Sequence, residues 1–332
     1  MNCGPCHSCV WYEPNQIEVE QRDDAKYRCT HTEVGGNFRV DFGCAYHTSP
    51  NDTACNVPDH VKEGTMTDPN PNPVDGPVEV LIVTHYKDFP WLVQALRCMR
   101  KYLSGFQGIT IAVPDHEMER FLPLHHQFDV RLHGYPEVPS KGMLGHMIKM
   151  AEADLFLPPA TKYVLTCDAD CMFRMATRPE HYFWNDKPYC IVRTWESLVS
   201  YERPGDPTSK VVSDCMIWKE PTDRQVGFDT PIFGMCMNTI VFPIDFFAPY
   251  RAHIEKVHNR SFRAFMLDGR NAWPQSNMDF TAMVAYAHRF MNDRWHWFDT
   301  AAPPYPTDRK KAYWSHGGLL PNIQQEIEGF LK

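Results

Sequence analysis

Short apolar runs alternate with amphipathic segments through the middle of the chain. Apolar, β-branched runs predict buried strands at 78–84, 109–113, 128–132 and 163–168. Apolar residues at helical spacing predict helices at 89–103, 118–121 and 142–157. Strands that alternate with helices through short loops predict an α/β fold, with a mixed, mainly parallel sheet flanked by helices.

The pattern changes after residue 170. Apolar runs predict two further strands, at 189–193 and at 234–242, the second closed by Pro243. Helices are expected at 246–259 and 280–290. The stretch from Glu196 to Val226 is polar and carries a turn at Pro204–Pro207.

Composition divides the chain into three parts. Residues 1–56 contain few apolar side chains and six of the 12 cysteines. Residues 57–77 contain five prolines, which fit neither a helix nor a central strand and predict a semi-rigid linker. Residues 78–332 then form the main domain, which is long enough to bury a large core.

The N-terminal part has the cysteine spacing of a small metal-stapled module. Such a segment needs a staple to fold alone, and thiolates at CxxC spacing can share one tetrahedral Zn²⁺. The preferred structural zinc ligands are Cys6, Cys9, Cys29 and Cys44. Alternative ligands are Cys3, His31, His47 and Cys55. An iron–sulfur cluster and disulfides remain alternatives to zinc.

Charge and hydropathy exclude some classes of protein. The net charge of −8 argues against a protein that coats nucleic acid nonspecifically. No apolar run reaches 18 residues, so no membrane span is expected. The first residues show neither a basic nor an apolar leader region, so a cytoplasmic location is expected, where reduced thiols and metal sites are commoner than disulfides.

Two carboxylates one residue apart follow the apolar run at 163–167. Asp168 and Asp170 would lie at the carboxyl end of a strand, where ligands bind in open α/β sheets. Like charges this close repel, and a divalent cation such as Mg²⁺ or Mn²⁺ would resolve the repulsion. The alternative is an ordinary polar turn. The chain shows neither a GxGxxG fingerprint nor a P-loop, so a bound nucleotide would depend on such a cation.

The order of these features resembles the GT-A fold glycosyltransferases of the DxD type. The resemblance covers about residues 78–320 and has no counterpart for the cysteine-rich module. Its elements are the first strand and helix, a helix with His146 and Lys149, the Asp168-Ala-Asp170 motif, the run Gly234-x-x-x-Asn238, Asp279 at a helix start, and His316 before two glycines.

The resemblance implies a metal-dependent transfer of a hexosyl or pentosyl group from a nucleotide sugar, most simply a UDP-sugar, to an acceptor hydroxyl. Catalytic Mn²⁺ or Mg²⁺ would be held by Asp168, Asp170 and His316. The donor would contact Tyr86, Asp115, Lys149 and Asn238. Asp279 would act as general base in an inverting reaction. Each role has a simpler alternative: Asp279 also suits a helix dipole, His316 a turn, and Lys149 an exposed helix face.

Several functions remain open at this level. The acceptor is expected to be a saccharide or protein hydroxyl, or a hydroxymethylated pyrimidine of DNA as modified by phage enzymes. The acidic net charge counts against DNA, because phosphate contacts dominate DNA affinity. A nucleotidyltransferase would use the same metal and release pyrophosphate. A zinc-stabilised interaction protein would bind no nucleotide sugar.

Overall fold

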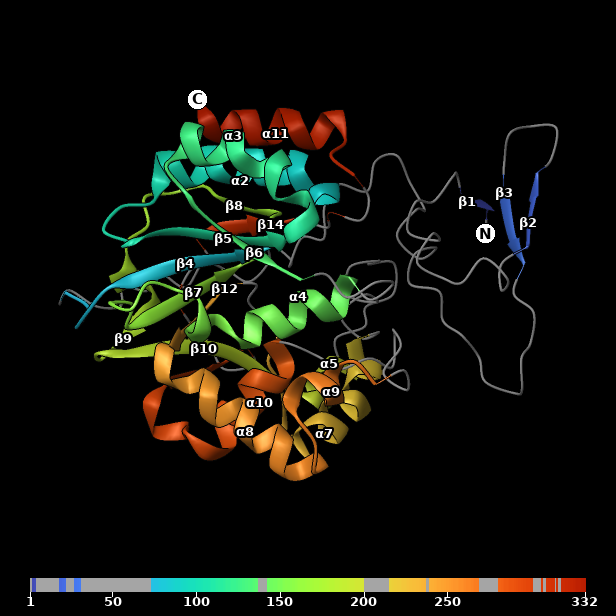
Figure 1. Cartoon of the computed structure of the whole chain (residues 1–332), viewed down its shortest axis with the longest axis vertical. Helices are drawn as coiled ribbons and strands as arrows, with labels where there is room; N and C mark the ends of the chain where they lie inside the picture. Colours follow the sequence, from blue (N-terminus) through green and yellow to red (C-terminus); the bar gives the residue numbers. More distant parts are fainter. Residues whose placement is uncertain are drawn as a thin grey trace.

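A computed structural model describes most of the main domain (Figure 1). Backbone and side chains are described for residues 73–136, 144–198, 215–236, 239–268, 280–300, 306, 309–313, 315 and 318–332. The backbone alone is described for residues 2–3, 18–21, 27–30, 142–143 and 199.

A five-stranded sheet in the order β12-β7-β4-β5-β6 forms the centre of the main domain. Its parallel strands are β4 (Val78–Val83), β5 (Gly108–Pro114), β6 (Arg131–Tyr135) and β7 (Tyr163–Cys167). Strand β12 (Thr239–Pro243) pairs antiparallel with β7. The prediction of a mixed, mainly parallel sheet is therefore confirmed.

Helices cover both faces of this sheet (Figure 1). One face packs against α2 (Phe89–Tyr102), α3 (Met118–Phe128) and α11 (Pro321–Leu331). The other packs against α4 (Gly142–Ala151), α8 (Phe247–His258) and α10 (Phe280–Phe290). Alternate residues of β4 enter opposite cores, with Val80 and Ile82 on the α2 side and Leu81 and Val83 on the α4 side. Within the described residues, every helix is too short or too polar to cross a membrane.

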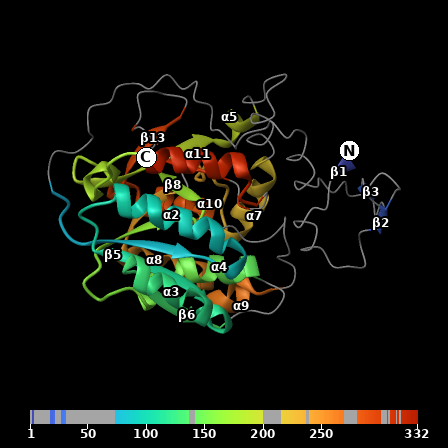
Figure 2. The same cartoon turned by 90° about the horizontal axis from the view of Figure 1, so that it is seen from above.

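A smaller sheet lies on the α4 side of the central sheet. Strand β10 (Lys187–Thr194) pairs parallel with β13 (His296–Asp299) and antiparallel with β11 (Ile232–Phe233) and β9 (Phe183–Trp184). Three short helices complete this half: α5 (Trp195–Val199), α7 (Lys219–Val226) and α9 (Phe262–Met266). Figure 2 shows the main domain from above, with α2 over the central sheet.

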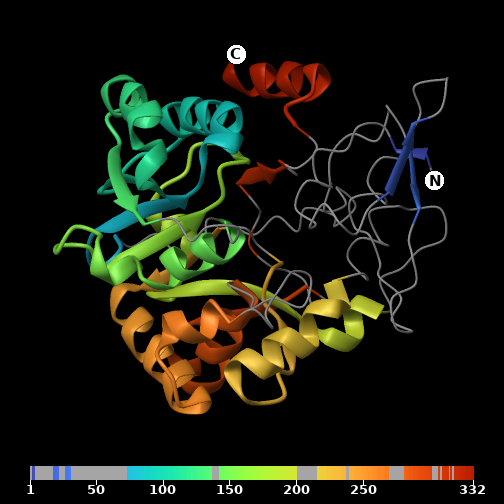
Figure 3. The same cartoon turned by 45° about the vertical axis from the view of Figure 1, so that its right-hand side comes forward.

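The C-terminal segment returns to the centre of the molecule. Strand β14 (Lys310–Ala312) pairs antiparallel with β8 (Cys171–Phe173), which directly follows the Asp168–Asp170 turn (Figure 3). Helix α11 then packs on α2, where Arg97 pairs with Glu328. The chain end therefore fixes the surroundings of the acidic turn.

One predicted strand begins later than expected. Residues 128–132 were expected to form a strand, but α3 continues to Phe128 and β6 begins at Arg131. Burial of Phe121, Leu124 and Phe128 on one helix face stabilises the longer helix despite its internal proline. Asp129 ends it in the left-handed conformation, with φ 50°.

Other expected boundaries also move. The helix expected at 142–157 ends at Ala151, and a short 3-10 turn follows. The strand expected at 234–242 begins at Thr239, where pairing with β7 begins. The polar stretch before Val226 contains α5 and α7; α7 buries Thr222 and Gln225 beside Val226, so its buried face gave little apolar periodicity. The expected helix at 280–290 is confirmed at both ends.

The N-terminal module is described only in part. Its backbone forms a three-stranded antiparallel sheet of β1 (Asn2–Cys3), β3 (Tyr27–Thr30) and β2 (Glu18–Gln21). Cys29 lies on β3, whereas Cys6, Cys9 and Cys44 lie outside the described residues. The zinc site therefore stays a prediction.

Gly234 lies where the backbone after β11 meets α10. A Cβ atom at this position would lie 2.5 Å from the Cβ of Val284. We expect Gly234→Ala to lower the free energy of unfolding by about 1–3 kcal/mol, because overpacking displaces a buried helix. Gly329→Ala is the control, since its Cβ meets nothing within 4 Å, and it should leave stability unchanged or raise it. Urea unfolding measures both, and equal stability of the two variants would contradict the expectation.

Candidate active site

The acidic turn lies at the switch point of the central sheet. From β4 the chain moves outward to β5 and β6, then crosses back to place β7 on the other side of β4. Loops that leave neighbouring parallel strands in opposite directions open a crevice at their carboxyl ends, where ligands bind. The residues after β4 include His85 and Asp88, and those after β7 include Asp168 and Asp170.

Three potential ligand atoms converge at this turn. One oxygen each of Asp168 and Asp170 and the Sγ of Cys171 all lie within 4.8 Å of one another. Asp170 is only 9% exposed, and its Oδ2 accepts a hydrogen bond from the backbone N–H of Ser315 at 2.9 Å. The N–H of Tyr313 donates to the Asp170 carbonyl at 3.0 Å. The C-terminal segment thus holds the turn in place.

The electrostatic environment disfavours a bare negative charge on Asp170. Burial and the nearby Asp88 carboxylate together raise the pKa of Asp170 to about 6, against the lowering effect of the Ser315 N–H. Asp88 itself lies 3.5 Å from the Nε2 of His85. Its Oδ1 is buried without a hydrogen-bond partner among the described residues. Negative groups are thus concentrated here.

These donors fit a hard divalent cation. Carboxylate oxygens are the ligands that Mg²⁺ and Mn²⁺ prefer, and a cation would offset the repulsion around Asp170. Cys171 is fully buried. Contact with the Cys167 thiol and burial raise the pKa of Cys171 well above its usual range.

Tyr86 lies in the loop after β4 and is 39% exposed. Its backbone N–H donates to Glu117 Oε2 at 2.6 Å, which joins this loop to the one after β5. The guanidinium of Arg120 lies 4.5 Å from the Tyr86 ring centre. An exposed ring beside the switch point is available to stack against a planar group.

Asp115 follows β5 at the same edge of the sheet. A Cβ atom at Gly134 would clash with Asp115 Oδ1, so the glycine allows the Asp115 side chain to lie close to the backbone of β6. The neighbouring His133 stacks on Phe156 with ring centres 4.2 Å apart. Burial and the charge of Lys149 lower the pKa of His133, while Asp115 acts in the opposite direction. His133 thus lies within electrostatic reach of two expected donor contacts.

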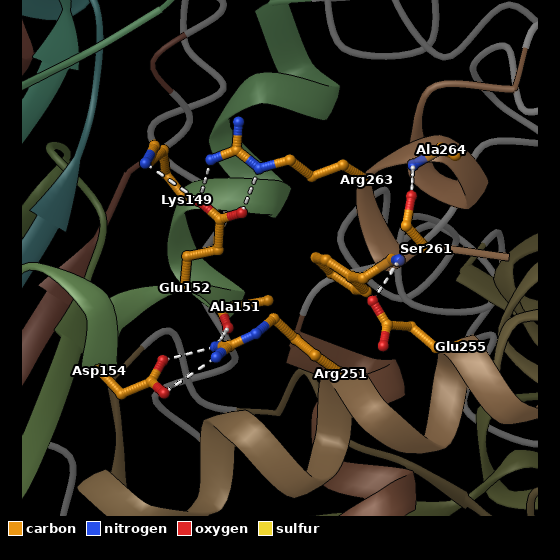
Figure 4. Close-up of polar contacts among 10 residues, drawn as sticks. Lys149, Ala151, Glu152, Asp154, Arg251, Glu255, Ser261, Arg263 and Ala264 are labelled. Atoms are coloured by element: carbon orange, nitrogen blue, oxygen red, sulfur yellow. Dashed lines mark hydrogen bonds and ion pairs between the residues drawn. The ribbon is translucent and has the colours of Figure 1, made fainter.

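Lys149 is held in an ion-pair cluster between α4 and α9 (Figure 4). It is 8% exposed and lies 3.0 Å from Glu152, whose two oxygens also accept hydrogen bonds from Arg263 at 2.5 and 2.6 Å. Burial works to raise the pKa of Glu152, but the bonds from Arg263 and Lys149 hold it below its ordinary value. This pairing gives Lys149 a structural role, and its expected donor contact stays a prediction.

Three expected site residues lie outside the described residues. They are Asn238, Asp279 and His316. Each has a described neighbour in the chain: β12 begins at Thr239, α10 begins at Phe280, and Ser315 donates to Asp170. Their roles as donor contact, general base and metal ligand remain predictions.

The structure adds groups that the sequence did not indicate. Asp88, Cys171 and the Ser315 amide all act on the acidic turn. Asp88 could have been noted because it follows an apolar strand and precedes a helix, as Asp115 does. Nothing in the sequence indicates Ser315, because a backbone amide carries no residue signature.

The Glu152 cluster provides a test of the packing. Glu152→Ala leaves Lys149 buried and removes both bonds to Arg263, so we expect unfolding to become easier by about 3 kcal/mol. The control is Glu220→Ala, which breaks an exposed pair with Arg224 on α7 and should cost less than about 0.5 kcal/mol. Urea denaturation measures the free energy of unfolding of both variants. A similar small decrease in both would show that the Glu152 cluster contributes little to stability.

The buried charge of Asp170 should appear in the pH dependence of stability without metal. The pKa of Asp170 is about 6 in the folded protein, above its ordinary value of 3.8, so protonation of this carboxyl favours the folded state. This contribution to stability is fully present below pH 3.8 and is lost as the pH rises through about 6. Asp170→Asn keeps a neutral acceptor for Ser315. In chelator, the Tm of the unmodified protein should therefore fall relative to the variant between about pH 5 and about pH 8.

Asp245→Asn is the control for this measurement, because Asp245 pairs with Arg294 at the surface. Its Tm difference from the unmodified protein should be the same at both pH values. If the Tm difference of Asp170→Asn is also constant, the raised pKa of the Asp170 carboxyl is contradicted.

Comparison with known proteins adds little. No family model and no curated protein matches the chain. Two structures of the glycosyltransferase GlyE of Streptococcus pneumoniae TIGR4 share 9% and 10% identity, with TM-scores of 0.32 and 0.35. The alignments cover 67% and 66% of this chain and 45% of each GlyE chain, so the chain spans less than half their length. Similarity this low assigns neither details of the fold nor function.

Proposed function

We propose that this protein is a divalent-cation-dependent glycosyltransferase that uses a nucleotide-sugar donor. One observation carries the proposal: the Asp168–Asp170 turn lies at the switch point between β4 and β7, and Asp170 is nearly buried there, where burial and the Asp88 carboxylate raise its pKa. A carboxylate with a strongly perturbed pKa in such a position is typical of functional sites. A carboxylate-bound cation can hold a diphosphate.

The reaction assigns a separate task to each group. The cation, when bound, acts as a Lewis acid on the leaving diphosphate. Asp168 and Asp170 hold it, and the Ser315 N–H orients Asp170. We assign to His316 the role of a further ligand, which would bind the cation beside the two carboxylates.

The loops after β4 and β5 form the nucleoside side of the site. Tyr86 offers an exposed ring, and Asp115 offers a carboxylate as hydrogen-bond acceptor. The Glu117 bond to the Tyr86 N–H keeps the two loops together. The base would stack on Tyr86, and a hydroxyl or N–H group of the ribose or base would donate a hydrogen bond to Asp115. Together these contacts would fix the orientation of the nucleotide sugar.

Asp279 is assigned as the base of an inverting reaction. It directly precedes Phe280, the first described residue of α10. Its role is to accept the proton of the acceptor hydroxyl as that oxygen attacks the sugar. The simpler effect, an acid beside a helix N-terminus, would leave turnover intact in Asp279→Asn.

Nucleotide binding tests the proposal directly. With Mn²⁺, a nucleoside diphosphate or nucleotide sugar at 100 times its dissociation constant should stabilise the protein by about 2.7 kcal/mol. Asp170→Asn should lose this metal-dependent shift while keeping its fold, and Asp245→Asn should retain it. Thermal denaturation with a panel of nucleotides measures the shift.

The products then identify the reaction. A glycosyltransferase releases a nucleoside diphosphate, whereas a nucleotidyltransferase acting through the same cation releases pyrophosphate. Pyrophosphate as the product would replace the proposed activity with nucleotidyl transfer. The absence of any metal-dependent shift across the panel, or full activity in Asp170→Asn, would overturn the proposal.

A further inference from the structure

Cys171 places a thiol within reach of the two carboxylates of the acidic turn. Its Sγ and one oxygen each of Asp168 and Asp170 lie within 4.8 Å of one another. Zinc–sulfur and zinc–oxygen bonds are about 2.3 Å and about 2.1 Å long, so ligands around one Zn²⁺ are separated by less than their sum of about 4.4 Å. Small side-chain movements would therefore bring all three atoms to one ion.

The position of Cys171 is fixed by secondary structure. It is the first residue of β8 and pairs with Ala312 of β14. Its N–H donates to the carbonyl of Asp168 at 3.2 Å, which closes the turn. Asp170 adds a carboxylate that is nine-tenths buried, and Asp88 adds a buried oxygen with no hydrogen-bond partner among the described residues. The carboxylates thus bring negative charge to this thiol, which exceeds the one positive charge brought by the buried Lys310.

A thiol beside two carboxylates changes which cations the turn prefers. Mg²⁺ and Mn²⁺ bind through oxygen and gain little from sulfur. Zn²⁺, Cd²⁺ and Co²⁺ form strong bonds to thiolate, and a coordinating thiol is deprotonated when it binds. One site can therefore hold hard cations through its two carboxylates and thiophilic cations through the carboxylates and the thiolate of Cys171.

We propose that Asp168, Asp170 and Cys171 form a thiophilic-cation site in which Zn²⁺ displaces the working Mg²⁺ or Mn²⁺ and inhibits the protein. The proposal rests on the proposed function for the identity of the working cation. Binding forms one metal–sulfur bond, breaks the S–H bond and releases one proton to solvent, with no change in oxidation state. While Zn²⁺ is held through sulfur, the working cation cannot occupy the same carboxylates, and turnover falls.

Cobalt substitution of the full chain tests the site without measuring activity. Thiolate coordination gives Co²⁺ a near-ultraviolet charge-transfer absorption. We expect this absorption to be smaller in Cys171→Ala than in the unmodified protein by the equivalent of one thiolate per chain. Cys190→Ala is the matched control, since Cys190 is equally buried on β10 in the other core, and its spectrum should be unchanged. The N-terminal cysteines contribute equally to all three spectra and cancel.

Competition shows whether the thiolate belongs to the acidic turn. Excess Mg²⁺ should remove the Cys171-dependent part of the absorption, and Asp170→Asn should reduce it. Cys171→Ala should weaken Cd²⁺ binding by more than about tenfold, while Mn²⁺ affinity changes by less than about twofold. Identical spectra of Cys171→Ala and the unmodified protein would overturn the proposed site.

The two proposals fail in different ways. If Mn²⁺ binds and is lost in Asp170→Asn, but Cys171→Ala leaves the cobalt spectrum unchanged, only the thiophilic site is wrong. If the cobalt signal depends on Cys171 but no nucleotide binds with Mn²⁺, the cation site stands and the proposed glycosyltransferase does not. If neither signal appears, both fail.

Discussion

The hydrogen bond from the Ser315 amide to Asp170 is the contact on which the candidate site depends. It places a backbone dipole from the C-terminal segment against a carboxylate that burial would otherwise drive toward the protonated form. The bond exists because β14 pairs with β8 directly after the acidic turn. A site at residues 168–171 therefore requires chain that lies about 140 residues later.

The topology of the sheet determines which groups meet this turn. Strand β7 lies between β4 and the antiparallel β12, so its carboxyl end adjoins the end of β4. Asp88 and Tyr86 reach the crevice from the β4 side. The loop after β5 is joined to the loop after β4 by Glu117, whose Oε2 accepts a hydrogen bond from the Tyr86 N–H. Neighbouring parallel strands thus place separate sequence segments around one crevice.

The pKa values of two buried carboxylates, Glu152 and Asp170, are shifted in opposite directions. Glu152 is surrounded by Lys149 and Arg263, and its pKa is lowered despite burial. Asp170 receives hydrogen bonds from Ser315, but burial and the Asp88 carboxylate outweigh them, and its pKa is raised. The first arrangement stabilises contacts between α4 and α9. The second is the arrangement on which the proposed cation site rests, because a perturbed carboxylate is more typical of functional sites.

The sequence by itself determined most of the central sheet. Strands β4, β5 and β7 and helices α2 and α10 were predicted because apolar periodicity is strong where an element buries one whole face. The acidic turn was predicted as a site for the same reason, since its strand pattern fixes where Asp168 and Asp170 emerge.

Only the tertiary structure decided the rest. Strands β8 and β14 have three residues each, and α11 buries one residue, Ile327, so their periodicity is weak and their pairing depends on distant chain. The effect of Asp88 on Asp170, the Ser315 bond and the convergence of Cys171 with two carboxylates are contacts through space. Local sequence carries no information on such contacts, because burial and neighbouring charge exist only after the segments have come together.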